Sequence, residues 1–528
     1  MARSPIFHQV RRSLRVASWL EQTKAGTAEG IERIEAARWD RRRFLGTTLA
    51  AAAGATLSPV RRAIAKGPQA PRVVIVGGGT AGLVCAHRLR ENGIAARVVE
   101  ASARAGGRMF SLRNFFPDNQ LTELGGEYID SNHLTMQRLV KELGLTLNDL
   151  AGKNEGEGHS YFFEGRLLPV DASFIDLFRP VAKAIASDLE KLKDSDDDEP
   201  EISYDTPHAE EIDRLSISEW LERRGVTGLV TRMLRAAYVG EYGLELDQQS
   251  ALNLLMTMGD EMPLDDVRIF GDSDERFHIV EGNDSVPTRL AKRLEKPVEF
   301  ATRLESIAND GDGFRLALRR DNATSDEKAD VVVLALPFTV LRQLDLRLEL
   351  PEAKRKAIQE LGYGMNAKLI AGFSRRVWEE AGSTGYTFTD MEFQCCWETS
   401  RGQPGSHSIL TNFAGGNLGL HLNDGDVQDR AASFVGQLEK IYPGVAEAFT
   451  KKAMRQHWPS APFTLGSYTC FKPGQYTTLA DSIATSVGNL FFAGEHTSVG
   501  FNGYMEGAAE SGERAAKEVL AKVGKRRL

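Results

Sequence analysis

Three glycines near the start of the chain have the spacing of a nucleotide-phosphate turn. Gly77, Gly79 and Gly82 follow the apolar run 73–76 and match the G-x-G-x-x-G pattern of a strand-to-helix turn. Gly77 permits a tight turn, Gly79 lets the backbone approach a pyrophosphate, and Gly82 lets helix and strand pack closely. The free amides where the helix begins can bind an anion. The residues expected to contact a dinucleotide here are Gly77, Gly79, Thr80, Ala81 and Gly82.

A carboxylate stands at the end of the next predicted strand. Residues 96–99 lead into Glu100, 18 residues after Gly82, where its carboxylate can accept hydrogen bonds from a ribose diol. A negative charge at this position disfavours a 2′-phosphate. Because strand, helix and acid are all in register, a bound dinucleotide is a better interpretation than a tight turn without a ligand.

The segment after Glu100 distinguishes between the candidate cofactors. Arg104 and Arg108 flank a second glycine pair, 106–107, and their guanidinium groups can reach a phosphate or a flavin. This E-A-x-x-R-x-G-G-R block resembles the flavin amine oxidase family, which includes monoamine, polyamine and L-amino acid oxidases. The resemblance spans residues 70–521 and continues, in the family's order, through 123–130, 277–287, 331–337, 491–497 and 503–512.

The resemblance implies that FAD is the cofactor. Glu495 would hydrogen-bond its ribityl or phosphate region, and the helix that begins near Glu506 would point its positive end at the flavin pyrimidine. Mitochondrial monoamine oxidases have a flavin-binding cysteine where this chain has Ser467, so the FAD is expected to be held non-covalently. The other cofactor contacts that the resemblance implies are Ala101, Arg104, Gly107, Arg108, Gly125, Gly126, Glu127, Val298, Trp458, Gly494, Gly503, Tyr504 and Met505.

The resemblance also implies the catalytic residues. Hydride transfer from the carbon next to an amine nitrogen to a flavin needs little acid–base help, so the protein must position the substrate and exclude water. Tyr468 and Tyr504 match two aromatic residues that flank the substrate nitrogen; alternatively, they are tyrosines of the core or of a domain interface. Lys368 matches a lysine that holds a water against flavin N5; alternatively, it is an exposed strand lysine.

A departure from the family bears on the substrate. Many L-amino acid oxidases bind the substrate carboxylate with an arginine after the glycine pair 125–126, but this chain has acids there, including Asp130. Arg401 or another arginine could bind a carboxylate. The acids could meet a cationic group remote from the reacting amine; alternatively, they cap helices or pair within the protein. The residues expected to form the substrate site are Glu127, Glu241, Trp397, Tyr468 and Tyr504.

Together these features favour an FAD-dependent amine or L-amino acid oxidase. It would convert its substrate, preferably a cationic one such as L-arginine or L-lysine, to an imine that hydrolyses to a keto acid or an aldehyde, with ammonia and hydrogen peroxide. Oxygen or a quinone could accept the electrons. The alternatives are a monoamine or polyamine oxidase, a flavin desaturase of the protoporphyrinogen or carotenoid type, and a non-catalytic flavin-binding partner protein.

Residues 1–65 have the pattern of an export signal. The arginines 41–43 precede an alanine-rich apolar stretch that ends at Leu57, and Ala63-Ile-Ala65 is a small-x-small cleavage pattern. This resembles a signal for the twin-arginine translocase. The apolar stretch, about a dozen residues, is too short to span ~30 Å of hydrocarbon. We expect a periplasmic enzyme that acquires FAD before export; the alternative is an amphipathic helix that stays on the protein.

Composition and motif positions predict the architecture. The 528 residues, with 42% hydrophobic content, are enough for two or three domains of an α/β protein. A Rossmann-like FAD-binding domain of the GR2 type should interleave with an α+β substrate domain that contains a mixed sheet. The FAD-binding segments would be 66–130, 275–345 and 455–528, and the substrate-binding segments would be 131–274 and 346–454.

Local sequence patterns predict the secondary structure of the inserted segments, and the charge and the cysteines argue against nucleic-acid and metal binding. The first inserted segment should be mostly helical, with a capping box at Ser216-x-x-Glu219, and the second should contain strands such as 368–373 and 408–413. A net charge of −8 provides no basic face for nucleic acid. The four cysteines lack C-x-x-C spacing, so no metal site is expected. A homo-oligomer is compatible with the sequence.

Overall fold

The computed structural model describes residues 71–150, 158–169, 172–192, 204, 206–258 and 274–525. The expected export signal at 1–65 lies outside the described residues. Among the helices within these ranges, none is both long enough and apolar enough to cross a membrane.

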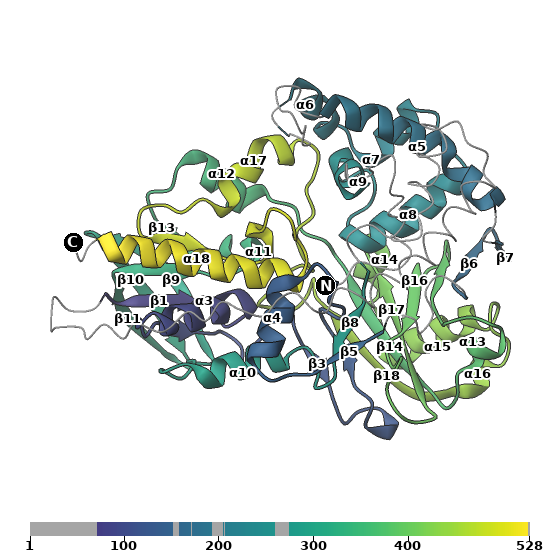
Figure 1. Ribbon diagram of the computed structural model, residues 1–528, viewed down its shortest axis with the longest axis horizontal. Coiled ribbons are helices and arrows are strands. Elements are labelled where there is room, and N and C mark those ends of the chain that lie inside the picture. Colours follow the sequence, from purple (N-terminus) through teal and green to yellow (C-terminus); the bar gives the residue numbers. More distant parts are fainter. Residues whose placement is uncertain are drawn as a thin grey trace, which may run out of the picture.

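One half of the molecule is built on a parallel sheet. Its elements are β1 (Val73–Val76), β2 (Arg97–Val99), β12 (Val331–Leu334) and β19 (Leu490–Phe492), with helices α3 (Thr80–Glu91) and α18 (Met505–Lys525) beside it. The strand order is β19-β12-β1-β2, and every pairing is parallel. Both faces are covered, so β1 and β12 are continuous apolar runs. Val73 and Ile75 pack with α3 and α18 (Figure 1), whereas Val74 and Val76 pack on the other face.

A second small sheet covers that other face. It contains β9 (Thr302–Asp310), β10 (Gly313–Arg320), β11 (Ala323–Ala329) and β13 (Asp345–Arg347), and the nearby helices are α11 (Phe338–Leu341), α12 (Glu352–Glu360) and α17 (Gln475–Ala484). β9, β10 and β11 are antiparallel neighbours, while β13 pairs parallel with β9. Phe314 and Leu316 of β10 join Leu334 of β12 in one apolar cluster, which binds the two sheets together.

The other half contains a seven-stranded mixed sheet with the order β18-β14-β17-β16-β15-β6-β7. Its strands are β6 (Ser160–Phe163), β7 (Arg166–Leu167), β14 (Ala367–Phe373), β15 (Thr387–Thr389), β16 (Cys395–Glu398), β17 (Ser408–Ala414) and β18 (Phe449–His457). β15 and β6 pair parallel and the other neighbours antiparallel. The helices around it are α13 (Val377–Glu380), α14 (Gly416–His421), α15 (Val427–Leu438) and α16 (Val445–Ala448).

The first inserted segment is mostly helical, as expected, and its helices α5 to α9 lie over this sheet (Figure 1). Its helices are α5 (Ala172–Leu192), α6 (Pro207–Asp213), α7 (Ile217–Arg223), α8 (Leu229–Tyr242) and α9 (Ala251–Met258). The predicted capping box is confirmed: the Glu219 amide donates to Ser216 Oγ at 3.1 Å, and the Ser216 amide donates to Glu219 Oε2 at 2.8 Å. α8 packs against β15 and β17, which places the helical layer beside the sheet.

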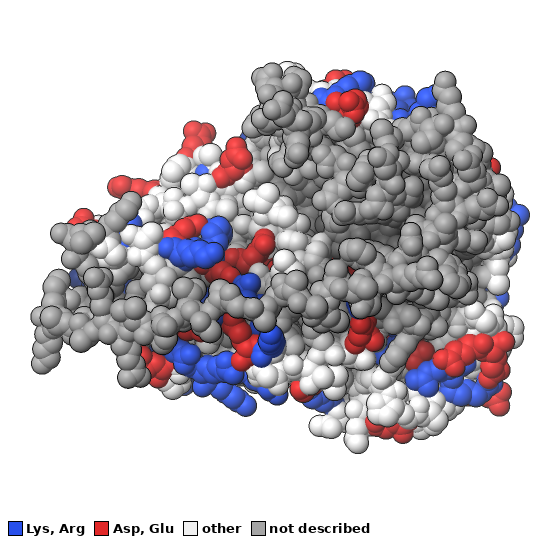
Figure 2. Space-filling view, viewed as in Figure 1, with Lys and Arg blue, Asp and Glu red and all other residues white. Residues whose placement is uncertain are grey.

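Several short elements complete the fold. They are β3 (Ser111–Leu112), the 3-10 helix η1 (Pro117–Asn119), β4 (Thr122–Glu123), α4 (Leu134–Glu142), β5 (Leu147–Asp149), β8 (Phe277–Ile279), α10 (Ser285–Arg293) and the 3-10 helix η2 (Glu495–Thr497). The predicted fold class is confirmed, because a parallel Rossmann-like sheet is combined with a mixed sheet. The expected segment boundaries stay a prediction; β18 crosses the one between 454 and 455. Charges of both signs alternate along the described surface in Figure 2.

Candidate active site

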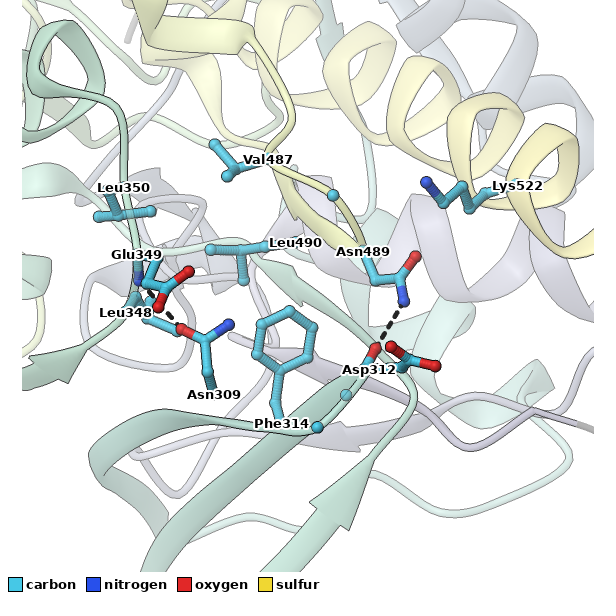
Figure 3. Close-up of a pocket in the computed structure, with 13 residues that line it drawn as sticks. Asn309, Asp312, Phe314, Leu348, Glu349, Leu350, Val487, Asn489, Leu490 and Lys522 are labelled. Carbon is cyan, nitrogen blue, oxygen red and sulfur yellow. Dashed lines mark hydrogen bonds between the residues drawn. The ribbon is translucent and has the colours of Figure 1, made fainter.

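Two cavities of about 420 Å³ differ in the chemistry of their linings. The first lies beside the β9–β10 turn (Figure 3), where Asn489 Nδ2 donates to the Asp312 carbonyl at 2.9 Å and the Glu349 amide donates to Asn309 Oδ1 at 3.0 Å. None of the residues expected to bind the cofactor or the substrate belongs to its lining. The second is lined by the glycine-rich turn, the 100–109 loop and the C-terminal motif. The second cavity is therefore the candidate active site.

The glycine-rich turn leaves backbone amides open toward this cavity. A Cβ at Gly82 would lie 2.0 Å from the Gly77 carbonyl oxygen, so glycine is needed for α3 to approach the strand this closely. By contrast, a Cβ at Gly79, which lines the cavity, would have no protein atom within 4 Å. Gly79 is the N-cap of α3, which has no side-chain cap and no acid in its first turn. These open amides at the positive helix end suit a pyrophosphate.

Glu100 stands beside this turn, at the end of β2, and lines the cavity. Its Oε2 accepts a hydrogen bond from the Gly78 amide at 2.7 Å, and its Oε1 accepts one from the Ser102 amide at 2.8 Å. The two bonds fix the carboxylate and leave lone pairs that can accept from ribose hydroxyls. The residues at this end of the cavity therefore fit the adenosine diphosphate part of FAD.

Arg104 lines the cavity but uses its guanidinium within its own loop. It donates to three carbonyl oxygens between residues 105 and 109, at 2.6 to 3.2 Å, and its Cζ lies 3.8 Å from the Phe110 ring centroid. The arginine therefore shapes the loop that faces the expected phosphates, and a direct contact with the cofactor stays a prediction.

Arg108 and Glu495 form a partly buried ion pair, 2.8 Å from Nη1 to Oε1, between the N-terminal and C-terminal motifs. Glu495 Oε2 also accepts hydrogen bonds from the Thr469 hydroxyl at 3.1 Å and the Gly503 amide at 2.8 Å. Burial raises the pKa of Glu495, but the charge of Arg108 and these hydrogen bonds outweigh it and hold the pKa below its ordinary value. The pair joins the two halves of the cavity wall. A direct contact of Glu495 with FAD stays a prediction.

Lys368 and Glu127 form a second ion pair, which is buried, 2.7 Å from Nζ to Oε2. Lys368 is 2% exposed, so the alternative of an exposed strand lysine is wrong. Its ammonium also donates to the carbonyl oxygens of Glu123 and Gly125, both at 2.9 Å. All three donors of the ammonium therefore have protein partners. The expected water-holding role stays a prediction, and it requires one of these bonds to open.

Glu127 has its charge matched within the protein. Besides the lysine, its Oε1 accepts a hydrogen bond from Trp397 Nε1 at 2.9 Å and another from the Thr399 hydroxyl. Burial raises the pKa of Glu127, and the attraction of Lys368 more than compensates, so the pKa lies below its ordinary value. This arrangement corresponds to the alternative in which the acid pairs inside the protein rather than with a substrate cation.

Tyr468 and Tyr504, called the tyrosine pair below, both line the cavity. A Cβ at Gly503 would lie 3.1 Å from the Tyr468 ring, so this ring lies against the backbone that leads to Tyr504. The Tyr468 hydroxyl donates to the Glu241 carbonyl oxygen, which links the ring to α8. The Tyr504 ring centroid lies 5.1 Å from that of His133. Both rings can therefore face a ligand in the cavity.

Two further residues of the C-terminal segment complete the wall. Ser467 lines the cavity, and its Oγ donates to Asn366 Oδ1 at 2.6 Å. Trp458 lines it as well and donates from Nε1 to the Leu124 carbonyl at 3.1 Å. The serine hydroxyl offers no group for a thioether bond to a flavin.

Some expected contacts lie behind the cavity wall rather than in it. A Cβ at Gly125 would lie 1.7 Å from the Arg108 carbonyl oxygen, so this glycine allows close packing of the wall. Conversely, segments that sequence motifs had not singled out line the cavity, including 302–305 and 461–464. They carry no distinctive pattern, and the fold alone brings them there. The expected residues outside the lining are Gly82, Gly125, Glu127, Glu241, Val298, Lys368 and Trp397.

The chain is similar in sequence and structure to known proteins. Residues 80–520 match the family model described as flavin containing amine oxidoreductase. Amine oxidase [flavin-containing] A of Sus scrofa is 27% identical over 462 residues, which cover 86% of this chain and 85% of that protein. The L-amino-acid oxidase of Siganus canaliculatus is 28% identical over 465 residues, 85% of each chain. In structure, cyclohexylamine oxidase from Brevibacterium oxydans has a TM-score of 0.75 and 20% identity over 86% of this chain and 100% of its own.

Proposed function

Because the chain belongs to the family of flavin-containing amine oxidoreductases, we propose that it is an FAD-dependent oxidase of an amine or an L-amino acid. It would form an imine that hydrolyses to an aldehyde or a keto acid, with ammonia and hydrogen peroxide as the other products. The observation that carries the proposal is the lining of one cavity: the glycine-rich turn and Glu100 stand at one end, and the tyrosine pair belongs to the same cavity.

The protein's own contribution to this reaction is binding and positioning. A bound flavin would supply the acceptor for the electrons of the C–H bond next to nitrogen. The tyrosine pair would flank the amine, and the tether from Tyr468 to α8 would hold one ring in place. Both tyrosines are buried, at about 5% exposure, so the amine would react away from bulk water.

We propose that the preferred substrate carries a positive charge remote from the reacting amine, as L-arginine and L-lysine do. The support lies in Glu275, which is 7% exposed and whose Oε1 has no hydrogen-bond partner within the described ranges. Glu127 gives no such support, because its charge is matched by Lys368. A buried carboxylate without a partner favours a ligand that brings positive charge.

Oxidation of a substrate panel tests the proposal. Purified holoenzyme would be supplied with L-arginine, L-lysine, L-leucine, putrescine and phenylethylamine, and ammonia and hydrogen peroxide would be measured together. We expect equimolar ammonia and peroxide, with the highest kcat/KM on a cationic substrate. Peroxide without ammonia, or oxidation of a porphyrinogen or polyene instead, would favour the desaturase alternative. Reduced quinone in place of peroxide would identify a quinone as the electron acceptor.

We further propose that FAD is bound without a covalent link and that the enzyme works in the periplasm. The serine at 467 supports the first point, since it replaces the cysteine to which other family members attach their flavin. Acid precipitation of the holoenzyme should release all its flavin; colour that stays on the precipitate would contradict this. Sedimentation of the holoenzyme would show whether it is a homo-oligomer.

A further inference from the structure

Two charged side chains, the buried Glu275 and the partly buried Arg401, have no part in the chemistry described so far. Glu275 is 7% exposed, and its Oε1 has no hydrogen-bond partner within the described ranges. The Nε of Arg401 is likewise buried without a hydrogen-bond partner there, and no described carboxylate forms a salt bridge with this guanidinium. Leaving a charged group buried and unpaired is costly unless a ligand supplies the missing partner.

Arg401 lies against an aromatic wall. Its Cζ is 5.4 Å from the ring centroid of Tyr386, whose hydroxyl donates to the Tyr128 hydroxyl at 3.3 Å. The Tyr128 ring in turn lies 6.4 Å from that of Trp397. The aromatic rings beside the guanidinium offer it few hydrogen-bond acceptors. Its N–H donors are therefore available to a carboxylate.

Glu275 lies among acids that connect to the candidate active site. Its amide donates to Asp130 Oδ1 at 2.8 Å. Burial, with the charges of Asp130 and Glu241, raises the pKa of Glu275 well above its ordinary value, while Arg401 acts in the opposite direction. Glu241 belongs to the same turn of α8 that holds Tyr468. The cluster thus adjoins the tyrosine pair.

Glu275 and Arg401 lie near each other in this cluster but do not meet directly. His133 stands beside Asp130 at 3.4 Å. Arg401 and Glu275 are close enough to alter each other's pKa, yet they form no salt bridge. A ligand that carries groups of both signs could bridge such a pair.

On this basis, and resting on the proposed function, we propose that Arg401 binds the substrate carboxylate and that Glu275 binds a cationic group at the end of the substrate side chain. The substrate is then a basic L-amino acid. Both residues would be specificity-determining rather than catalytic, since the tyrosine pair flanks the reacting amine.

Four substrates separate the two roles. L-Lysine has both the carboxylate and the side-chain cation, L-norleucine has only the carboxylate, cadaverine has only the cation, and pentylamine has neither. The holoenzyme variants are Arg401→Met and Glu275→Gln. The matched controls are Arg223→Met and Glu222→Gln, which change the same charges on the exposed surface of α7.

Each variant should alter one selectivity ratio and spare the other. Arg401→Met should lower the kcat/KM ratio of L-lysine to cadaverine, and that of L-norleucine to pentylamine, by roughly 10- to 100-fold. Glu275→Gln should lower the ratios of L-lysine to L-norleucine and of cadaverine to pentylamine by a similar factor. The controls should change no ratio. Unchanged ratios in both variants, or equal losses on all four substrates, would overturn the proposal.

A binding measurement keeps the proposal testable if turnover is poor. 2-Methyl-L-lysine has no hydrogen at its α carbon, so it cannot be oxidised there, but it carries both charges. We expect it to raise the Tm of the wild-type holoenzyme and of both control variants, and to raise that of Arg401→Met and Glu275→Gln much less. If the wild type oxidises none of the four substrates, the proposed function fails. If it oxidises them but the variants keep wild-type ratios and Tm shifts, only the roles of Arg401 and Glu275 fail.

Discussion

At the scale of single residues, two ion pairs, one buried and one partly buried, join segments that are far apart in the chain. Arg108 and Glu495 are separated by 387 residues, and Lys368 and Glu127 by 241. Each pair also uses its remaining hydrogen-bonding capacity on backbone or side-chain partners, which is the condition under which a buried pair is tolerated. Losing one member leaves the other as an unmatched buried charge.

Lys368→Met should therefore destabilise the protein strongly. We expect a loss of about 3–5 kcal/mol in the free energy of unfolding, because Glu127 would keep a buried charge without its partner. The double variant Lys368→Met/Glu127→Gln should recover part of this loss. Urea denaturation of both variants, with the exposed Lys440→Met as control, measures the effect. A Lys368→Met protein as stable as the control would show that the pair contributes nothing.

The same pair should produce a pH dependence. The pKa of Glu127 lies below its ordinary value of 4.5, so the unfolded chain binds this proton at a higher pH than the folded protein does. The resulting stabilisation is present above 4.5 and disappears as the pH falls toward the folded value. The free energy of unfolding should thus decrease more steeply below pH 4.5 in the wild type than in Glu127→Gln. If the free energy of unfolding fell equally with pH in both proteins, the lowered pKa of Glu127 would be contradicted.

Glu100→Ala should weaken FAD binding. The variant loses an acceptor for the ribose hydroxyls and the bond that fixes the Gly78 amide, which together should cost roughly 1.5–3 kcal/mol of binding. Flavin fluorescence during dilution of the holoenzyme measures the dissociation constant. The exposed Glu91→Ala, on α3, serves as the control. Retention equal to that of the control would argue against the ribose contact.

At the scale of elements, the turn between β1 and α3 contains one glycine that the packing of the fold needs and one that the cofactor site needs. Gly82 and Gly79 belong to the same turn, but one faces protein and the other faces the cavity. Gly79 has φ −72°, which any residue adopts, so an alanine there strains no backbone. A side chain added at Gly79 would therefore enter the cavity, whereas one added at Gly82 would collide with protein backbone.

Gly79→Ala and Gly82→Ala should accordingly have different effects. Gly79→Ala should change the Tm of the apoprotein by only a few degrees, since the loss at the N-cap is within about 1 kcal/mol, while FAD binding weakens at least tenfold. Gly82→Ala should lower both the Tm and FAD binding, because its Cβ would collide with the strand turn. Calorimetry and flavin titration measure the two. If Gly79→Ala bound FAD normally, the phosphates would lie elsewhere.

At the scale of the whole molecule, the active-site cavity lies where segments from both ends of the described chain meet. Its lining runs from residue 76 to residue 508. Such a cavity forms only when the chain is folded, and FAD then stabilises the folded state. A folded, cofactor-loaded protein is also what the proposed export route would carry.

Replacing Arg41 and Arg42 by lysine should leave the enzyme in the cytoplasm. The twin-arginine route recognises paired guanidinium groups as an address, and lysine keeps the charge but not the planar donor group. Amine oxidase activity in periplasmic and cytoplasmic fractions measures the outcome. Active enzyme that still reaches the periplasm at the wild-type level would refute the role proposed for residues 1–65.

The sequence by itself determined the fold class, the family and the glycine-rich turn with Glu100. These features depend on residues close together in the chain, where spacing dictates geometry: a β-branched run, glycines at 77, 79 and 82, and an acid 18 residues later. The capping box at Ser216 was predictable for the same reason.

Only the tertiary structure decided which charges are matched. Glu127 was expected to face a substrate cation, yet it pairs with Lys368, and Glu275 is an acid with one oxygen that has no hydrogen-bond partner in the described part of the chain. Lys368 comes from a strand 241 residues away, and nothing in local spacing indicates that partner. Whether a buried carboxylate is satisfied depends on the packing of distant segments, because burial removes the water that would otherwise solvate it.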